Sequence, residues 1–245
     1  MSQQEIAVVV GATGAFGVPI VKRLLDAGLE VIAVSRSGSS DELSGVRTVK
    51  ADISDDSSIE IIRAAIDKPV RMIVHGPGVA VAGGVLTADT GALVDAVNIK
   101  VGGVLRLVRA VDEHLVENSR LVAIGGHYGL EPTAYAAAAG VANAALMSVM
   151  RQLSLAYGER GITAHTVAPG PADTERLHRV VAERAASRGV STEEVLDELR
   201  ADSSLNALTT PDQVAWAITM LLAPEATAMT GSTLMLDAGR RRGLP

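Results

Sequence analysis

The chain has 245 residues, a length that suits one large α/β domain, and 48% of them are apolar, enough for a sizeable core. Its formal charge is −6 and no basic stretch stands out, so we expect no nucleic-acid surface. No apolar run reaches the ~18 residues needed to span a bilayer, and the early first strand leaves no room for a signal peptide, which predicts a soluble, cytoplasmic protein. The lack of cysteine excludes disulfides, thiolate nucleophiles and Cys-ligated metals, and we predict no metal site.

Short β-branched runs alternate along the chain with amphipathic segments of helical length. Strands are expected at 6–10, 30–35, 46–52, 70–76, 120–125, 161–169 and 232–237. Helices are expected at 17–27, 57–66, 91–116 and 135–158. Runs that are apolar on both faces and separated by helices indicate a parallel sheet covered on each side. The sequence therefore predicts one doubly wound α/β domain.

Helix punctuation supports this organisation. Thr210 and Pro211 suit the N-cap and first position of one helix, and Ser191 with Glu194 reads as a capping box. The charged, helix-prone segment 172–204 departs from the strand–helix alternation, and we expect it to form a helical lid over the substrate.

The stretch VVVGATGAFG places three glycines, Gly11, Gly14 and Gly17, between a buried strand and a helix. Glycines there let the backbone approach a pyrophosphate, whose charge then lies at the helix N-terminus. We therefore assign this turn, with Thr13 and Phe16, to cofactor binding. The alternative is a turn that is merely tight.

The ends of the second and third strands carry the next cofactor signals. Ser35 and Arg36 stand where an acidic residue would accept bonds from the adenosine ribose, and a guanidinium beside a hydroxyl suits a 2′-phosphate. NADP(H) is therefore favoured over NAD(H), unless Arg36 is only a solvated loop residue. Asp52, followed by Ile53, either holds the adenine amino group or caps the next helix.

These signals lie in order with Asn98, Tyr135 and the stretch VAPGPADT, and together they resemble the short-chain dehydrogenase/reductase family over essentially the whole chain. The resemblance implies a Rossmann-type sheet, a nicotinamide cofactor and a catalytic tetrad of Asn, Ser, Tyr and Lys. It also assigns Pro169, Gly170 and Thr174 to the cofactor site.

The resemblance matches the tetrad only in part. Asn98 and Tyr135 match the Asn and Tyr, whereas the Ser position is Gly126 and the Lys position, four after the tyrosine, is Ala139. A phenol has a pKa of ~10, and a cation one helical turn away would lower it toward neutrality. Without that cation and the serine, Tyr135 should be a poor catalyst of hydride transfer.

Neighbouring side chains are candidates to compensate. His127 and Tyr128 follow Gly126 directly and would add donors near the nicotinamide, or they turn outward and fill space. His75 and Gly76, in HGPG after the fourth strand, are expected beside the cofactor. We expect Lys100, two residues after Asn98, to point to another helix face and to be solvated.

Three functions are compatible with this pattern. The first is an NADP(H)-dependent oxidoreductase acting on a small or medium carbonyl or alcohol through a non-standard active site. The second is the same fold with lyase or dehydratase chemistry through Tyr135 and a histidine, and the third is an inactive nucleotide-binding protein. The Ala-rich helix 135–158 has a flat face of small residues, which the resemblance assigns to a homodimer or homotetramer contact.

Overall fold

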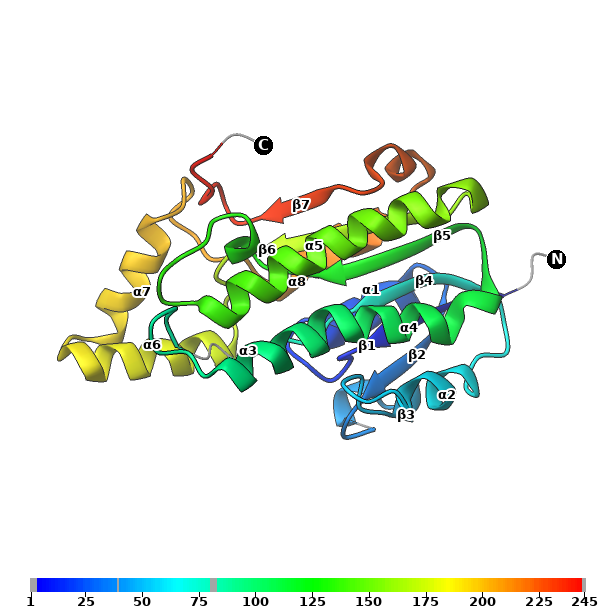
Figure 1. The fold of residues 1–245 in the computed structure, drawn as a ribbon, viewed down its shortest axis with the longest axis horizontal. Helices are drawn as coiled ribbons and strands as arrows, with labels where there is room; N and C mark the ends of the chain where they lie inside the picture. The colour runs from blue at the N-terminus through cyan, green and yellow to red at the C-terminus, as the bar shows by residue number, and fades with distance from the viewer. Residues whose placement is uncertain (1–3, 39, 80–82, 244–245) are drawn as a thin grey trace.

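A computed structural model of the chain describes residues 4–38, 40–79 and 83–243. Within them, seven parallel strands form one sheet in the order β3-β2-β1-β4-β5-β6-β7, with helices on both faces (Figure 1). The strands are β1 Ile6–Val10, β2 Glu30–Ser35, β3 Arg47–Lys50, β4 Val70–His75, β5 Leu115–Ile124, β6 Thr163–Pro169 and β7 Thr233–Leu236. The single doubly wound, Rossmann-type domain is confirmed.

The central strands are buried on both faces because their side chains alternate between two cores. In β1, Val8 and Val10 pack with the helices of one layer, and Ala7 and Val9 pack with those of the other. One layer holds α2, α4 and α5, and the opposite layer holds α1 and α8. This explains why the strands read as continuous apolar runs rather than as alternating ones.

The helices depart from expectation in one long segment. The predicted helix 91–116 is divided, because Asn98–Gly102 forms a π-helical turn between two α-helices. The other helices begin and end within a few residues of their predicted bounds. The helices are α1 Gly17–Asp26, α2 Ser58–Arg63, α3 Thr90–Val97, α4 Gly103–Val111, α5 Ala137–Tyr157, α6 Glu175–Arg188, α7 Thr192–Ala201 and α8 Pro211–Met220. Among the described residues, no helix is both long and apolar enough to cross a membrane.

Helix α5 begins two residues later than predicted, and this places Tyr135 outside it. The backbone before the helix bonds instead to the loop after β4: Val85 N–H donates to the Ala134 carbonyl at 2.8 Å, and Ala137 N–H donates to the Gly83 carbonyl at 3.3 Å. Residues i and i+4 share a face only within a helix. The expected one-turn relation between Tyr135 and Ala139 is therefore wrong.

The segment 172–204 contains α6 and α7, which lie together at one end of the molecule (Figure 1). They bury a small apolar cluster of their own, separate from the two main cores. Ser191 caps α7 by accepting from the Glu194 N–H at 3.1 Å, which is one half of the predicted capping box. Thr210 caps α8 in a reciprocal capping box with Gln213, as the sequence predicts for that N-cap.

Candidate active site at the carboxyl edge of the sheet

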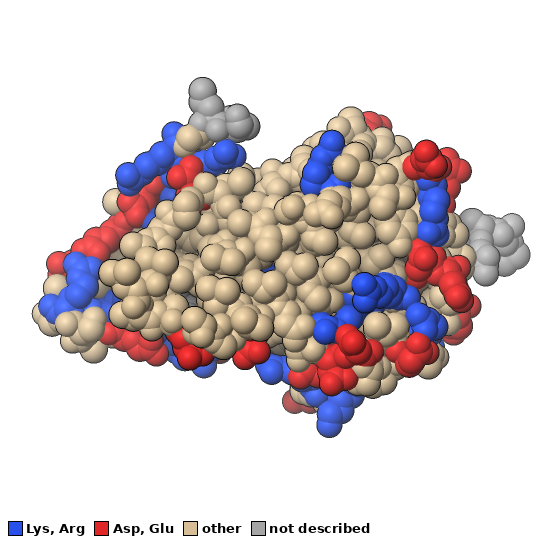
Figure 2. Space-filling model, viewed as in Figure 1, with Lys and Arg blue, Asp and Glu red and all other residues tan. Residues whose placement is uncertain are grey.

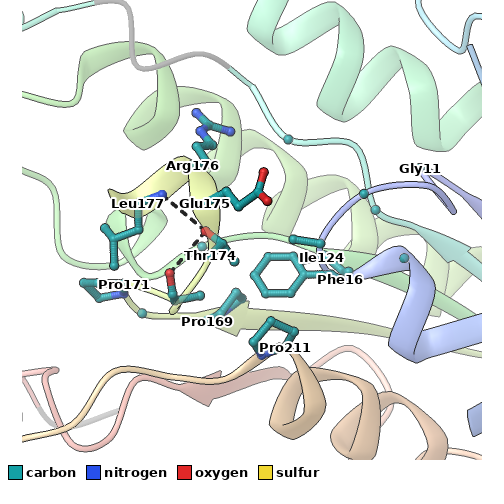
Figure 3. A pocket seen from close by; sticks show the side chains of 18 of the residues that line it. Gly11, Phe16, Ile124, Pro169, Pro171, Thr174, Glu175, Arg176, Leu177 and Pro211 are labelled. Carbon is teal, nitrogen blue, oxygen red and sulfur yellow. Dashed lines mark hydrogen bonds between the residues drawn. The ribbon is translucent and has the colours of Figure 1, made fainter. Parts of the chain in front are cut away.

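A pocket of about 1150 Å³ opens at the carboxyl ends of four neighbouring strands. Each of these strands is followed at once by a glycine, and all four glycines line the pocket: Gly11, Gly76, Gly125 and Gly170. The pocket floor is therefore largely backbone. The chain reverses its winding between β1 and β4, and ligands of open α/β sheets bind at such a point. Figure 3 shows the pocket between the β1–α1 turn and the start of α6.

The β1–α1 turn has the geometry that a phosphate needs. Gly11 has φ +82°, a conformation that glycine adopts readily, and a Cβ on Gly17 would lie 2.2 Å from the Gly11 carbonyl oxygen. No side chain caps the N-terminus of α1, where Phe16 holds the N-cap position. The first N–H groups of the helix therefore have no side-chain acceptor, and the Val18 N–H donates to the Gly14 carbonyl at 3.2 Å. All five residues predicted for this turn line the pocket: Gly11, Thr13, Gly14, Phe16 and Gly17.

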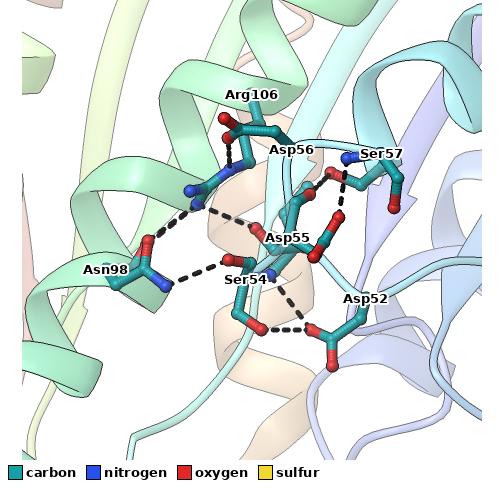
Figure 4. A network of polar contacts seen from close by, with 9 residues as sticks. Asp52, Ser54, Asp55, Asp56, Ser57, Asn98 and Arg106 are labelled. Carbon is teal, nitrogen blue, oxygen red and sulfur yellow. Dashed lines mark hydrogen bonds and ion pairs between the residues drawn. The ribbon is translucent and has the colours of Figure 1, made fainter.

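The predicted adenosine-side residues lie beyond the walls of this pocket. Ser35 accepts from the Gly38 N–H at 3.0 Å and so shapes the loop after β2. Asp52 accepts from the Ser54 N–H at 3.0 Å and from its hydroxyl at 2.7 Å (Figure 4). These bonds hold the pKa of Asp52 below its ordinary value, and nearby Arg36 lowers it further. Ser35, Arg36, Asp52 and Ile53 are absent from the pocket lining among the described residues, and their cofactor roles stay predictions.

Asn98 has a structural position rather than a place in the pocket wall. Its Nδ2 donates to the Ser54 carbonyl at 3.0 Å, and its Oδ1 accepts from Arg106 at 2.9 Å (Figure 4). Arg106 in turn pairs with Asp56 at 2.6 Å. The network joins the π-helical turn to the loop before α2. It gives the predicted catalytic role of Asn98 no geometric support.

Lys100, not Asn98, lies in the pocket wall. Its side chain is only 3% exposed, and Nζ donates to the carbonyl of Ile124 at 2.6 Å, at the end of β5. The expectation that Lys100 is solvated is wrong because the π-helical turn changes the direction in which residues 98–102 project.

The end of β4 contributes backbone to the pocket, whereas His75 faces the interior. His75 is fully buried, and its Nε2 donates to the Ile99 carbonyl at 3.0 Å. Burial, aided by the charge of Lys100, lowers the pKa of His75 to about 3. Gly76 lines the pocket as predicted. His75 is not among the described residues that line the pocket, and its neutral ring packs behind them.

Two tyrosines and a histidine form one side of the pocket mouth. The hydroxyls of Tyr128 and Tyr135 lie 2.9 Å apart, and the Arg184 guanidinium stacks 4.9 Å from the centre of the Tyr135 ring. Burial, followed by the bond to Tyr135, raises the pKa of Tyr128. His127 is buried, and its burial lowers its pKa to about 4. The structure brings all three predicted residues to the pocket, with His127 in its neutral form at pH 7.

On α5, the positions one turn apart that face the pocket are Ala139 and Asn143. Asn143 is buried, and a Cβ added to Gly126 would lie 2.8 Å from its Nδ2. Its Oδ1 has no hydrogen-bond partner among the described atoms. Asn143 was not among the predicted site residues. The sequence feature that could have identified it is a single amide in an alanine-rich run, four residues after Ala139.

The segment after β6 closes the pocket opposite the glycine turn. Pro169, Gly170 and Thr174 all line it as predicted, and Thr174 caps α6 by accepting from the Leu177 N–H at 3.3 Å (Figure 3). Arg176, one residue into the helix, donates to the Val79 carbonyl and so ties α6 to the loop after β4.

Comparison with known proteins agrees with this geometry. Residues 11–241 match the family described as Enoyl-(Acyl carrier protein) reductase. The chain is 27% identical over 259 residues to the short-chain reductase protein NovJ of Streptomyces niveus, covering 98% of this chain and 95% of that protein. It is 26% identical over 250 residues to 3-oxoacyl-(acyl-carrier-protein) reductase FabG of Vibrio cholerae, covering 96% of each. The fold resembles L-sorbose reductase of Gluconobacter frateurii, solved with NADPH and L-sorbose, at a TM-score of 0.87 and 18% identity over 98% of both chains.

Proposed function

The chain belongs to the short-chain dehydrogenase/reductase family, and on that basis we propose that it is an NADP(H)-dependent oxidoreductase of small or medium carbonyls and alcohols. The observation that carries the proposal is the β1–α1 turn, because glycine backbone and a helix N-terminus without a side-chain cap suit a dinucleotide phosphate. The similarity to two reductases, NovJ and FabG, supports carbonyl reduction.

The residues present fit a nicotinamide dinucleotide along the glycine floor. The turn Gly11–Gly17 would hold the pyrophosphate, and Pro169, Gly170 and Thr174 would border the nicotinamide end. Asn143, whose buried Oδ1 lacks a partner, offers an acceptor for a cofactor or substrate group. A bound nicotinamide supplies or accepts the hydride, and the protein supplies binding, orientation and proton transfer.

We propose NADP(H) rather than NAD(H) because Arg36 stands exposed at the end of β2. The related L-sorbose reductase binds NADPH, which supports the choice. Titration calorimetry should give a lower Kd for NADPH than for NADH. Arg36→Ala should weaken NADPH binding ~10-fold or more and leave NADH unchanged, since a charge-assisted bond contributes about 1.5–3 kcal/mol. Arg63→Ala, on the remote helix α2, is the matched control. Equal affinity for both cofactors in the unchanged protein would refute the preference.

The active site of this proposal is non-standard. Gly126 and Ala139 bring neither a hydroxyl nor an amine to the pocket, and the Tyr128–Tyr135 pair stands at its mouth. That absence of side chains also supports the second candidate, a lyase or dehydratase on the same fold.

Isotope transfer separates the two candidates. With (4,4-²H₂)NADPH and a panel of small ketones and β-ketoesters, a reductase incorporates deuterium at the carbonyl carbon. Turnover of a substrate without deuterium transfer would instead establish the non-redox reaction.

We propose that α6 and α7 form the substrate lid. Arg176, Arg179 and Arg184 line the pocket from α6, and Arg184 contacts Tyr135 across the opening. These contacts support the proposal that the α6 side of the pocket, opposite the glycine turn, selects the substrate.

We also propose a homodimer or homotetramer formed through α3, α4 and α5. Figure 2 shows a broad uncharged surface over these helices, with charged residues mostly at its edges. Val94 on α3 is 64% exposed, and Val141 and Leu155 on α5 are 47% and 66% exposed. Such a patch on a water-soluble chain is typical of a protein contact. Sedimentation should give a multiple of the chain mass, and Leu155→Arg should lower it.

A further inference from the structure

Lys100 is the one buried lysine among the described residues, and it lies in the wall of the pocket. Its Nζ donates to the Ile124 carbonyl at 2.6 Å, at the point where β5 gives way to Gly125 and Gly126. Within the described part of the chain it forms no ion pair with a carboxylate. An ammonium has three donors, and one of them is used here.

Neighbouring elements fix the backbone turn that carries Lys100. His75 donates to the carbonyl of Ile99, and a Cβ on Gly103 would lie 2.7 Å from the His75 ring. Asn98 binds the turn to Ser54 on the other side. The π-helical turn is thus fixed on both flanks of Lys100, and such turns occur frequently at functional sites.

An unpaired buried lysine is costly to folding, so its presence calls for a compensating role. The charged and titratable groups that face it are Arg176 from α6 and His75 from β4, and neither is an anion. The polar contact that β5 makes with Lys100 Nζ is the Ile124 carbonyl, which accepts its hydrogen bond. The arrangement leaves the ammonium without a neutralising partner beside a floor of glycine backbone, where a substrate oxygen can approach.

We propose that Lys100 is the acid–base residue of this pocket: its Nζ donates a proton to the oxygen of a substrate carbonyl whose carbon receives the hydride. The C=O bond becomes C–H and O–H, the electron pair comes from the reduced nicotinamide, and the neutral amine takes up a proton from water. In the oxidation direction the neutral amine accepts the hydroxyl proton. This inference rests on the proposed oxidoreductase function.

The protonation chemistry of the site agrees with this role. Burial, with the repulsion of Arg176, lowers the pKa of Lys100 to about 7. A group with that pKa both donates and accepts protons near neutral pH. By contrast, burial raises the pKa of Tyr128, and His75 and His127 are neutral supports at pH 7.

Two substitutions test the role of Lys100 in turnover. Lys100→Met removes the proton donor, and Lys100→Arg keeps the charge on a group that does not release its proton near pH 7. Both should lower kcat by ~10²–10⁴ while NADPH affinity changes less than about threefold. Lys68→Met, at a half-buried lysine that pairs with Glu30 at the far end of β4, is the matched control and should retain full activity.

A readout independent of turnover is the titration of the lysine itself. In uniformly ¹⁵N-labelled protein, the Nζ resonance that disappears in Lys100→Arg should titrate near pH 7, and Arg176→Met should move the midpoint upward by removing a like charge. The rate of reduction should fall as pH rises through the same midpoint. Thermal unfolding monitored by circular dichroism verifies that each variant is folded.

The outcomes separate this inference from the function on which it rests. Wild-type protein that binds no NADPH and transfers no deuterium would refute the oxidoreductase proposal. An active wild type with kcat unchanged in a folded Lys100→Met or Lys100→Arg variant would refute the role of Lys100 alone. A lysine that titrates near 10, or loss of stability with an unchanged pH profile, would likewise show that Lys100 is a structural tether.

Discussion

The two ends of the pocket differ in composition: backbone forms the end at the β1–α1 turn, and side chains form the end between β5 and α5. At the β1–α1 turn, backbone forms the proposed phosphate site: Gly11 has positive φ, Gly17 admits no Cβ, and no side chain caps the start of α1. At the β5–α5 end, side chains line the pocket, and Tyr135 and Lys100 project differently from expectation. Backbone sites follow from local spacing, whereas side-chain sites depend on how each helix begins and turns.

The strongest test of the backbone end is Gly17→Ala. The added Cβ would lie 2.2 Å from the Gly11 oxygen and 2.5 Å from the Ala12 carbonyl group, so the turn must shift. We expect NADPH affinity to fall by ~10² or more, because misplacement of about 1 Å has effects of this size. Titration calorimetry measures the Kd of NADPH for this variant. Gly158→Ala, where a Cβ meets nothing within 4 Å, is the matched control and should bind normally.

A substitution at the β5–α5 end of the pocket should also act by displacing a neighbouring group, but the loss of activity should be smaller. Gly126→Ser would place its Cβ 2.8 Å from Nδ2 of Asn143, which must then move. We expect kcat/KM to fall ~10-fold or more through this displacement. Adding Asn143→Ala should relieve the contact and restore part of the rate. A single Gly126→Ser variant that gains activity on simple ketones would indicate a decayed reductase site instead.

Tyr135→Phe distinguishes the two candidates for proton transfer. Its hydroxyl contacts that of Tyr128, its side chain is 42% exposed, and it precedes α5. If Lys100 is the proton donor, kcat should fall less than about tenfold. Steady-state kinetics on an established substrate, with Tyr157→Phe as the remote control, measures this. A loss of ~10² or more with intact NADPH binding would return the acid–base role to Tyr135.

The last expected effect is on the dependence of stability on pH. Because the folded pKa of Lys100 is about 7 and its ordinary value is 10.5, the unfolded chain binds the extra proton between these pH values. The free energy of unfolding therefore rises with pH in that window, by at most about 1.4 kcal/mol per pH unit from this group. Lys100→Met should lack this contribution. Urea unfolding of both proteins from pH 7 to 10 should show the difference, and parallel curves would contradict a buried, depressed lysine.

The sequence predicted the sheet well and one part of the site. Strands 6–10 and 30–35 match their observed bounds because buried β-branched runs between turns define a central strand. The prediction for the β1–α1 glycine turn agrees with the structure because its backbone constraints are set by residues close together in the sequence. Helical periodicity, however, could not reveal the π-helical turn at 98–102, so it misplaced Lys100. Nor could it show that the loop after β4 binds the backbone at Ala134 and delays α5.

The proposed lid of α6 and α7 has a consequence for how the substrate preference could be changed. Its apolar cluster, centred on Val181, Val195 and Leu196, is shared by neither main core. We therefore expect that residues 175–201 can be exchanged as a cassette with little effect on the sheet, provided that the packing against Leu208 is kept. A transplanted cassette must reproduce the bond of Arg176 to the loop after β4, the contact of Arg184 with Tyr135, and the bond of the Leu199 carbonyl with Arg240. New specificities could be grafted by replacing that cassette while the glycine floor stays untouched.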